Sequence, residues 1–168
     1  FDIVLVETVG VGQSEVMVAE MTDFFMVLML AGAGDEIQGI KRGIMELADC
    51  LAVNKADGDN VGAARRAMTT YNGALKFMRG PEDAWQPKAL LCSGLEGSGL
   101  DELWRTVCDH RKVLESAGAF QGHRSMQQVQ WFERLVDQGV REWIAANPGA
   151  FKTLDTLRGE VKDGAMSP

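Results

Sequence analysis

The sequence predicts an α/β fold: a parallel sheet with helices on both faces, followed by a C-terminal helical extension. Short apolar runs alternate with amphipathic stretches over residues 1–117, which is typical of a parallel sheet built from strand–helix units. The predicted strands are apolar almost throughout, as expected of strands covered on both faces. From residue 118 onward the apolar residues recur at helical spacing only. We therefore divide the chain into a domain of residues 1–117 and an extension of residues 118–168.

The elements of the first domain are expected in strict alternation. Strands are predicted at residues 2–7, 24–30, 50–54 and 88–92. Helices are predicted at residues 14–21, 37–47, 60–78 and 100–116. The run at residues 24–30 contains no polar side chain, which predicts a central strand. Gly80 and Pro81 separate the third helix from the last strand.

The extension is predicted to contain a break at residues 118–122 and then a helix at residues 127–147, ended by Asn147, Pro148 and Gly149. Its apolar residues are Met126, Val129, Trp131, Phe132, Leu135, Val136, Val140, Trp143 and Ile144. A final short helix is marked by Phe151, Leu154, Leu157 and Val161. This apolar stripe either packs on the domain or forms a dimer contact, where large aromatic residues are enriched.

Composition restricts the class of protein. A net charge of −7 argues against a nucleic-acid surface. The three cysteines lack a Cys-x-x-Cys spacing and are interpreted as buried free thiols in a reducing compartment. The two histidines, His110 and His123, are expected at the surface, so a metal site built from His and Cys is not predicted. The longest apolar run, residues 24–33, is too short to span a bilayer, and no membrane partner is expected.

Residues 54–57, Asn-Lys-Ala-Asp, follow an apolar strand and precede a polar turn, where open α/β sheets bind their ligands. The carboxylate of Asp57 can accept from the ring N–H and the amine of guanine, a donor pair that adenine lacks. The amide of Asn54 can brace the loop or reach the purine, and the stem of Lys55 can lie along the base. The pattern predicts a guanine site, with a solvated turn as the alternative.

Two further strand ends extend this site. Glu7 ends the first predicted strand shortly before Gly10, which suits a water-linked Mg²⁺ and a γ-phosphate bound by a backbone N–H. The alternative for Glu7 is a plain solvated carboxylate. Ser93, Gly94 and Leu95 follow the last strand, and their backbone N–H groups could meet a base oxygen. The predicted ligands are therefore GTP or GDP and Mg²⁺.

With these motifs the chain resembles a known family. Residues 7–15, Glu-Thr-Val-Gly-Val-Gly-Gln-Ser-Glu, and residues 34–44 are similar to segments of the MeaB/ArgK GTPases, accessory proteins of adenosylcobalamin-dependent methylmalonyl-CoA mutase. The resemblance extends to about residue 144. It implies part of a P-loop GTPase-type sheet, GTP hydrolysis that gates adenosylcobalamin delivery to the mutase and protection of that enzyme, and a homodimer through the C-terminal helices. The expected location is the cytoplasm of a bacterium, or the mitochondrial matrix of a eukaryote.

The chain also departs from the family pattern. It contains no G-x-x-x-x-G-K-[ST] loop to cradle phosphates, so we expect it to be the C-terminal half of a longer protein and inactive as an isolated fragment. Gln13 is a candidate for orienting the attacking water. In Ras-like GTPases, however, the glutamine directly follows the motif glycine, where this chain has Val11. Slow intrinsic hydrolysis is therefore expected until a partner completes the site.

A cluster of polar residues is predicted to act as a switch that reports the nucleotide state to the mutase, with a solvated loop as the alternative. These residues are Asp35, Glu36, Gln38 and Lys41. Two other functions stay open for the chain as a whole. One is a dimerisation or docking module that binds no nucleotide, and the other is a nickel-insertion type of GTPase, which usually carries Cys and His metal ligands.

Overall fold

A computed structural model describes residues 1–8, 14–31, 42–78, 80 and 82–167. Contacts divide the chain into two compact units, Phe1–Ser125 and Met126–Pro168. This division falls inside the long helix at Ala119–Ala146. The domain boundary expected after residue 117 stays a prediction. None of the helices in the part of the chain described is both long and apolar enough to cross a membrane.

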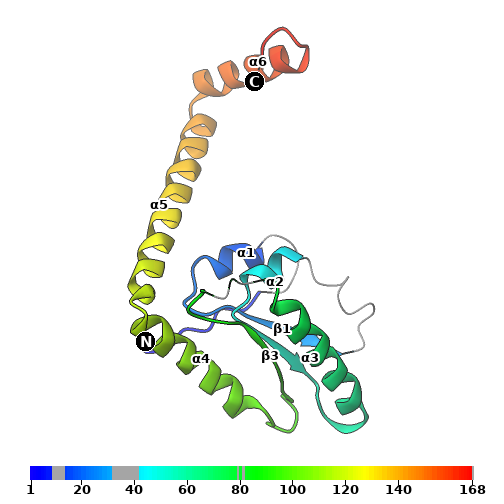
Figure 1. Ribbon diagram of the computed structural model, residues 1–168. Coiled ribbons are helices and arrows are strands. Elements are labelled where there is room, and N and C mark those ends of the chain that lie inside the picture. The colour runs from blue at the N-terminus through cyan, green and yellow to red at the C-terminus, as the bar shows by residue number, and fades with distance from the viewer. Residues whose placement is uncertain (9–13, 32–41, 79, 81, 168) are drawn as a thin grey trace. The chain divides into compact units, whose positions relative to one another are not determined.

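The first unit contains a parallel sheet, which confirms the predicted fold class (Figure 1). Among the described residues it has three strands, β1 at Met26–Leu30, β2 at Cys50–Asn54 and β3 at Lys88–Leu91. Their order is β1-β2-β3, with Met29 opposite Val53 and Val53 opposite Leu91. The carboxyl ends of β2 and β3 therefore meet at one edge of the sheet.

Alternation of side chains along β2 builds two cores, because successive residues of a strand point to opposite faces. On one face, Leu51 and Val53 pack with Ala89 against helix α3, Val61–Leu75. That helix contributes Ala64, Ala67, Tyr71 and Leu75. On the other face, Cys50 and Ala52 pack with Leu90 of β3 and with Cys92, which follows that strand. Leu103 of helix α4, Leu100–Ser116, covers this second core. Helices thus cover both faces of β2, as the apolar sequence of this strand predicts.

Two predictions about strands were wrong. The segment at residues 24–30 was expected to be central, but β1 lies at the edge of the described sheet, and Met26, Leu28 and Leu30 are exposed. Residues 2–7 were expected to form a strand, yet they form none and their apolar side chains are exposed. In the described structure β1 pairs with β2 alone, which makes it an edge strand.

The helices of the first unit lie close to their predicted positions. Helix α1 spans Ser14–Ala19, and α2 spans Arg42–Leu47, which is the described part of the predicted helix at residues 37–47. A 3₁₀ turn, η1 at Gly58–Asn60, leads into α3. Helix α4 has the predicted bounds. Gly99 precedes it with a left-handed φ of 77°, a conformation that favours glycine.

Helix α5 spans Ala119–Ala146 and corrects the predicted break at residues 118–122. The interruption is confined to Ala117 and Gly118, whose backbone N–H groups bond to Val113 and Glu115 of α4. Gly122 lies inside the helix, since one interior glycine costs only about 1 kcal/mol relative to alanine. The predicted end of the helix is confirmed: α6, Pro148–Lys162, begins after Asn147, whose side chain accepts from Gly149 and Ala150.

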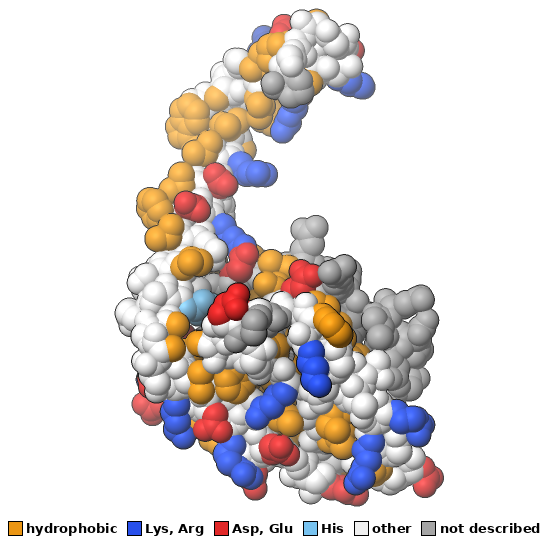
Figure 2. Space-filling view, viewed as in Figure 1, with side chains coloured by type: hydrophobic (Ala, Val, Ile, Leu, Met, Phe, Trp, Pro, Cys, Tyr) orange, Lys and Arg blue, Asp and Glu red, His pale blue; other side chains and the backbone are white. Residues whose placement is uncertain are grey.

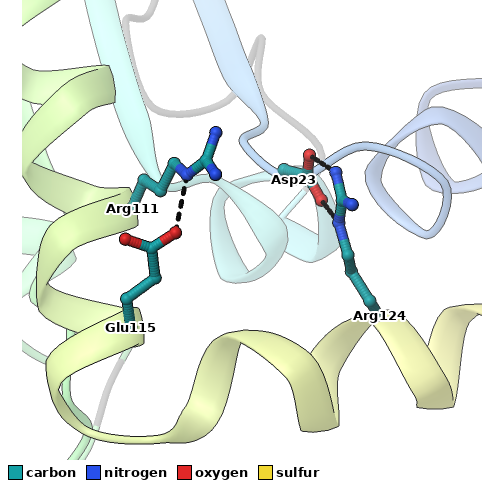
Figure 3. Close-up of polar contacts among 4 residues, drawn as sticks. All are labelled: Asp23, Arg111, Glu115 and Arg124. Carbon is teal, nitrogen blue, oxygen red and sulfur yellow. Dashed lines mark hydrogen bonds and ion pairs between the residues drawn. The ribbon is translucent and has the colours of Figure 1, made fainter.

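Within the first unit, an ion pair joins the start of α5 to the loop before β1 (Figure 3). Arg124 donates to both carboxylate oxygens of Asp23, in the loop before β1, with Nε–Oδ1 2.7 Å and Nη2–Oδ2 2.5 Å. The guanidinium groups of Arg111 and Arg124 also lie 5.4 and 5.0 Å from the ring centre of Phe120. Such a bidentate arrangement holds a carboxylate more firmly than a single hydrogen bond does.

We expect this pair to give a small, acid-sensitive contribution to stability. The hydrogen bond from Arg124 lowers the pKa of Asp23 below its ordinary value of 3.8. The stabilisation is therefore complete above that value and is lost as the pH falls through the lowered pKa. Asp23→Asn should reduce the free energy of unfolding at pH 7 by less than about 1 kcal/mol, because both side chains are partly exposed.

Urea denaturation of the native protein at pH 7 and at successively lower pH measures this difference. The difference between wild type and Asp23→Asn should shrink in acid, whereas Asp137→Asn, on an exposed position of α5, should have no effect at either pH. If the free energies of unfolding of wild type and Asp23→Asn differ by the same amount down to pH 2, the Asp23–Arg124 pair is not the source of the acid sensitivity.

Candidate guanine-nucleotide site

The two predicted base loops lie side by side because β2 and β3 are neighbours. The pairing continues past the strands, where Cys92 N–H donates to Val53 O at 3.0 Å and Ala56 N–H donates to Cys92 O at 3.0 Å. The loop after β2 thereby folds against the end of β3. Residues 40 positions apart in the sequence are brought into contact at the carboxyl edge of the sheet.

Asn54, the last residue of β2, joins the two loops. Its side-chain oxygen accepts from Lys55 N–H at 2.7 Å and from Gly94 N–H at 3.1 Å. Both donors are backbone amides, so the amide oxygen of Asn54 must face them. Asn54 was expected either to brace the loop or to reach the purine, and in the structure its oxygen braces both loops.

Asp57 is held by Ser93. The Ser93 hydroxyl donates to Asp57 Oδ2 and accepts from Glu96 N–H at 3.0 Å. Ser93 is fully buried, and its own backbone closes the loop through Ser93 N–H to Ser98 O at 2.9 Å. A carboxylate fixed in this way is already oriented before a ligand arrives, which lowers the entropic cost of binding.

The arrangement suits recognition of a guanine base. Asp57 offers a positioned carboxylate for N–H donors of a base. The backbone N–H groups of Ser93 and Gly94, which were expected to meet a base oxygen, are instead bonded to Ser98 O and Asn54 Oδ1. Lys55 and Leu95 are exposed beside these groups, so their side chains are accessible to a ligand. The structure thus brings together the residues predicted for the base: Asn54, Lys55, Asp57, Ser93, Gly94 and Leu95.

Of the residues predicted for the phosphate, the metal and the switch, the structure describes Glu7 alone. Glu7 is exposed and lies outside any strand or helix. Gly10 and Gln13 lie outside the described residues, as do Asp35, Glu36, Gln38 and Lys41. Within the residues that are described, no group of three or more His, Cys, Asp or Glu side chains is arranged to hold a metal ion. Mg²⁺ at Glu7 stays a prediction.

The cysteines of the sheet, Cys50 in β2 and Cys92 after β3, are buried thiols. Cys50 and Cys92 are free and buried, as predicted, whereas Cys108 is free but only partly buried. Burial raises the pKa of the Cys50 thiol to about 12 and also raises the pKa of the Cys92 thiol. Both thiols are therefore protonated near neutral pH, which makes them poor nucleophiles.

Three residues were missed by the sequence reasoning. Asn60 was predicted only as part of a turn and the first residue of a helix, but its side-chain N–H donates to Lys55 O at 2.7 Å. Gly99 closes the loop after β3 and lies against the backbone of Leu91. Its signal was the glycine-rich run at residues 94–99, in which only Gly94 and Leu95 were predicted to have a role.

The third is His110, whose predicted surface position was wrong: the residue is 4% exposed. Its ring contacts Phe24 and Trp85 edge-on, both at 5.1 Å between ring centres, and its Nε2 lies 3.6 Å from Asp49 Oδ1. Trp85 Nε1 also donates to Asp49 O at 2.9 Å. This cluster lies at the start of β1 and β2, the opposite edge of the sheet from the base loops. His123 is exposed, as predicted.

Comparison with known proteins gives consistent matches. Residues 1–149 match the family described as Methylmalonyl Co-A mutase-associated GTPase MeaB. The chain is 46% identical over its whole length to half of a probable GTPase, Rv1496, of Mycobacterium tuberculosis. It is 39% identical over its whole length to 40% of a Mus musculus protein named Methylmalonic aciduria type A homolog, mitochondrial.

A solved structure shows the same fold. The crystal structure of a LAO/AO transport system kinase superposes with a TM-score of 0.80 and 39% identity, covering 96% of this chain and 51% of that one. The chain spans about half the length of the curated relatives it matches.

Proposed function

Since this chain belongs to the MeaB family of methylmalonyl Co-A mutase-associated GTPases, we propose that the native protein binds GTP and GDP with Mg²⁺ and hydrolyses GTP. The observation that carries the proposal is the pair of braced loops at the ends of β2 and β3. There Ser93 orients the Asp57 carboxylate and Asn54 binds both loops. An oriented carboxylate selects guanine over adenine because adenine would leave the charge without its two donors.

The proposed biological role is that of an accessory protein of methylmalonyl-CoA mutase. GTP hydrolysis would gate the delivery of adenosylcobalamin to the mutase and the protection of that enzyme. The family description and the name of the mouse relative support this partnership. The proposed location is the bacterial cytoplasm, with the mitochondrial matrix as the eukaryotic counterpart.

Within that role, residues near the predicted strand ends take separate tasks. Glu7 holds Mg²⁺ through water, Gly10 contacts the γ-phosphate, and Gln13 lies near the attacking water. The segment containing Asp35, Glu36, Gln38 and Lys41 is the switch that the mutase reads. The support is the sequence similarity of residues 7–15 and 34–44 to the family.

The helical unit supports a homodimer as part of the proposal. Hydrophobic side chains follow one another along α5 (Figure 2). The exposed ones are Met126, Val129, Trp131, Phe132, Leu135, Val136, Val140 and Trp143. An exposed apolar stripe with two tryptophans is typical of an association surface. The same stripe favours the alternative function, a docking module that binds no nucleotide.

Single-turnover hydrolysis of GTP by the native protein, with and without the mutase, separates these functions. We expect slow hydrolysis alone and faster hydrolysis with the mutase. Lys41→Ala should keep the affinity for GTP and lose much of the stimulation, because a switch acts on coupling and not on ground-state binding. Lys76→Ala, an exposed lysine at the far end of α3, is the matched control and should be stimulated normally. Absence of GTP binding by the wild type would leave the docking module as the function.

A further inference from the structure

We infer that Asn60 is a positioning residue for the nucleotide site: it holds the peptide of Lys55 in a left-handed conformation and so presents the lysine stem to the face of the base. The inference rests on the proposed function, because it assigns a role within the guanine site. It concerns the flat face of the base, whereas Asp57 reads the edge.

The starting observation is the backbone of Lys55. Its φ is 57°, and among the described residues it is the one non-glycine residue with a positive φ. A side chain with a Cβ is disfavoured in this region, because the Cβ comes too close to the following carbonyl oxygen. Such a conformation persists only where the surroundings impose it, and imposed strain of this kind is concentrated at ligand sites.

Two side-chain amides hold Lys55 in its left-handed conformation. Lys55 N–H donates to the oxygen of Asn54 at 2.7 Å, and Lys55 O accepts from Nδ2 of Asn60 at 2.7 Å. Both polar groups of this residue's backbone are thus bonded to side chains and not to the sheet. Ala56 N–H, which follows, is bonded to Cys92 O, so the chain on either side of Lys55 is fixed as well.

The turn explains how Asn60 reaches back. Asn60 N–H donates to Asp57 O at 3.0 Å, which closes the 3₁₀ turn and carries the side chain of residue 60 to the carbonyl of residue 55. Gly58 allows this turn with its own φ of 50°. Asn54 and Asn60 bind different groups of Lys55: the oxygen of Asn54 accepts from Lys55 N–H, whereas Nδ2 of Asn60 donates to Lys55 O.

Loss of the Asn60 donor should release the carbonyl of Lys55 and leave the left-handed conformation supported on the N–H side only, so that it is populated less. The lysine stem would then leave the base face. Asp57 would stay in place, because it is held by Ser93 and not by Asn60. The loss of affinity should therefore be the same for every purine nucleotide whose base contacts the lysine stem, whatever groups the edge of that base carries.

The test measures dissociation constants of the native protein for GTP and for inosine triphosphate, which lacks the exocyclic amine. Asn60→Asp keeps the size of the side chain but cannot donate, and Asn60→Ala removes the group. Both variants should bind GTP and inosine triphosphate more weakly than the wild type, by the same factor of about 3- to 10-fold. Asp59→Asn, an exposed change in the same turn, is the matched control and should leave both affinities unchanged.

A double-mutant cycle with Lys55→Ala then distinguishes positioning from general stability. If Asn60 acts through the lysine stem, Asn60→Ala should add no further loss of affinity in the Lys55→Ala background. A full additional loss there, or unchanged affinities in both Asn60 variants, overturns the inference while leaving the proposed function intact. A wild-type protein that binds neither nucleotide overturns the proposed function and this inference with it.

Discussion

Gly99→Ala is expected to destabilise the protein by about 2–5 kcal/mol, which combines backbone strain with a steric clash. A Cβ at this position would lie 2.2 Å from Leu91 O and 3.1 Å from the Cα of Cys92. Both neighbours are backbone atoms at the end of β3, so no side-chain rotation relieves the contact. Relief requires α4 to move away from the sheet, and α4 covers one face of β2 through Leu103.

The same change should weaken nucleotide binding in the molecules that remain folded. Gly99 follows Ser98, whose carbonyl accepts from Ser93 N–H and closes the loop. Displacing this end of the loop moves the hydroxyl that holds Asp57. Urea denaturation and GTP affinity of the native protein measure the two effects.

Gly97→Ala is the matched control, because it introduces the same residue at nearly the same φ without a clash. Gly97 has a φ of 73°, and no atom lies within 4 Å of the position its Cβ would take. This variant should lose only about 1–2 kcal/mol, the cost of the left-handed conformation. Equal losses for the two variants would show that the close approach to Leu91 does not determine stability.

Asp57→Asn is expected to lower the affinity for GTP by at least about 100-fold, because the amide presents a donor where guanine also presents donors. Xanthosine triphosphate carries a carbonyl in place of the exocyclic amine, so it should bind the variant better than GTP does. Ser93 can still donate to the remaining oxygen of residue 57, so the loop should keep its position.

Affinities of the native protein for GTP, xanthosine triphosphate and ATP give the result directly. Asp59→Asn makes the same chemical change two residues away on an exposed side chain and should leave the preference for GTP intact. If Asp57→Asn retains the wild-type preference, Asp57 does not read the base, and the proposed guanine site is wrong.

The sequence by itself determined the features that depend on local pattern. The continuous apolar run of β2 predicted burial on both faces, and the helical spacing of residues 100–116 predicted α4 with the observed bounds. Asn54 and Asp57 were recognisable because a short motif after a buried strand lies at the ligand edge of a parallel sheet. Each of these conclusions needs only a few consecutive residues.

The tertiary structure alone decided what depends on partners distant in the chain. Residues 2–7 and 24–30 have similar apolar sequences, but in the described structure only the second forms a strand, which pairs with β2. The burial of His110 follows from rings contributed by Phe24 and Trp85. The role of Asn60 required the positive φ of Lys55, and that of Gly99 required the nearby carbonyl of Leu91. No local pattern encodes such distances, because the packing of the whole unit sets them.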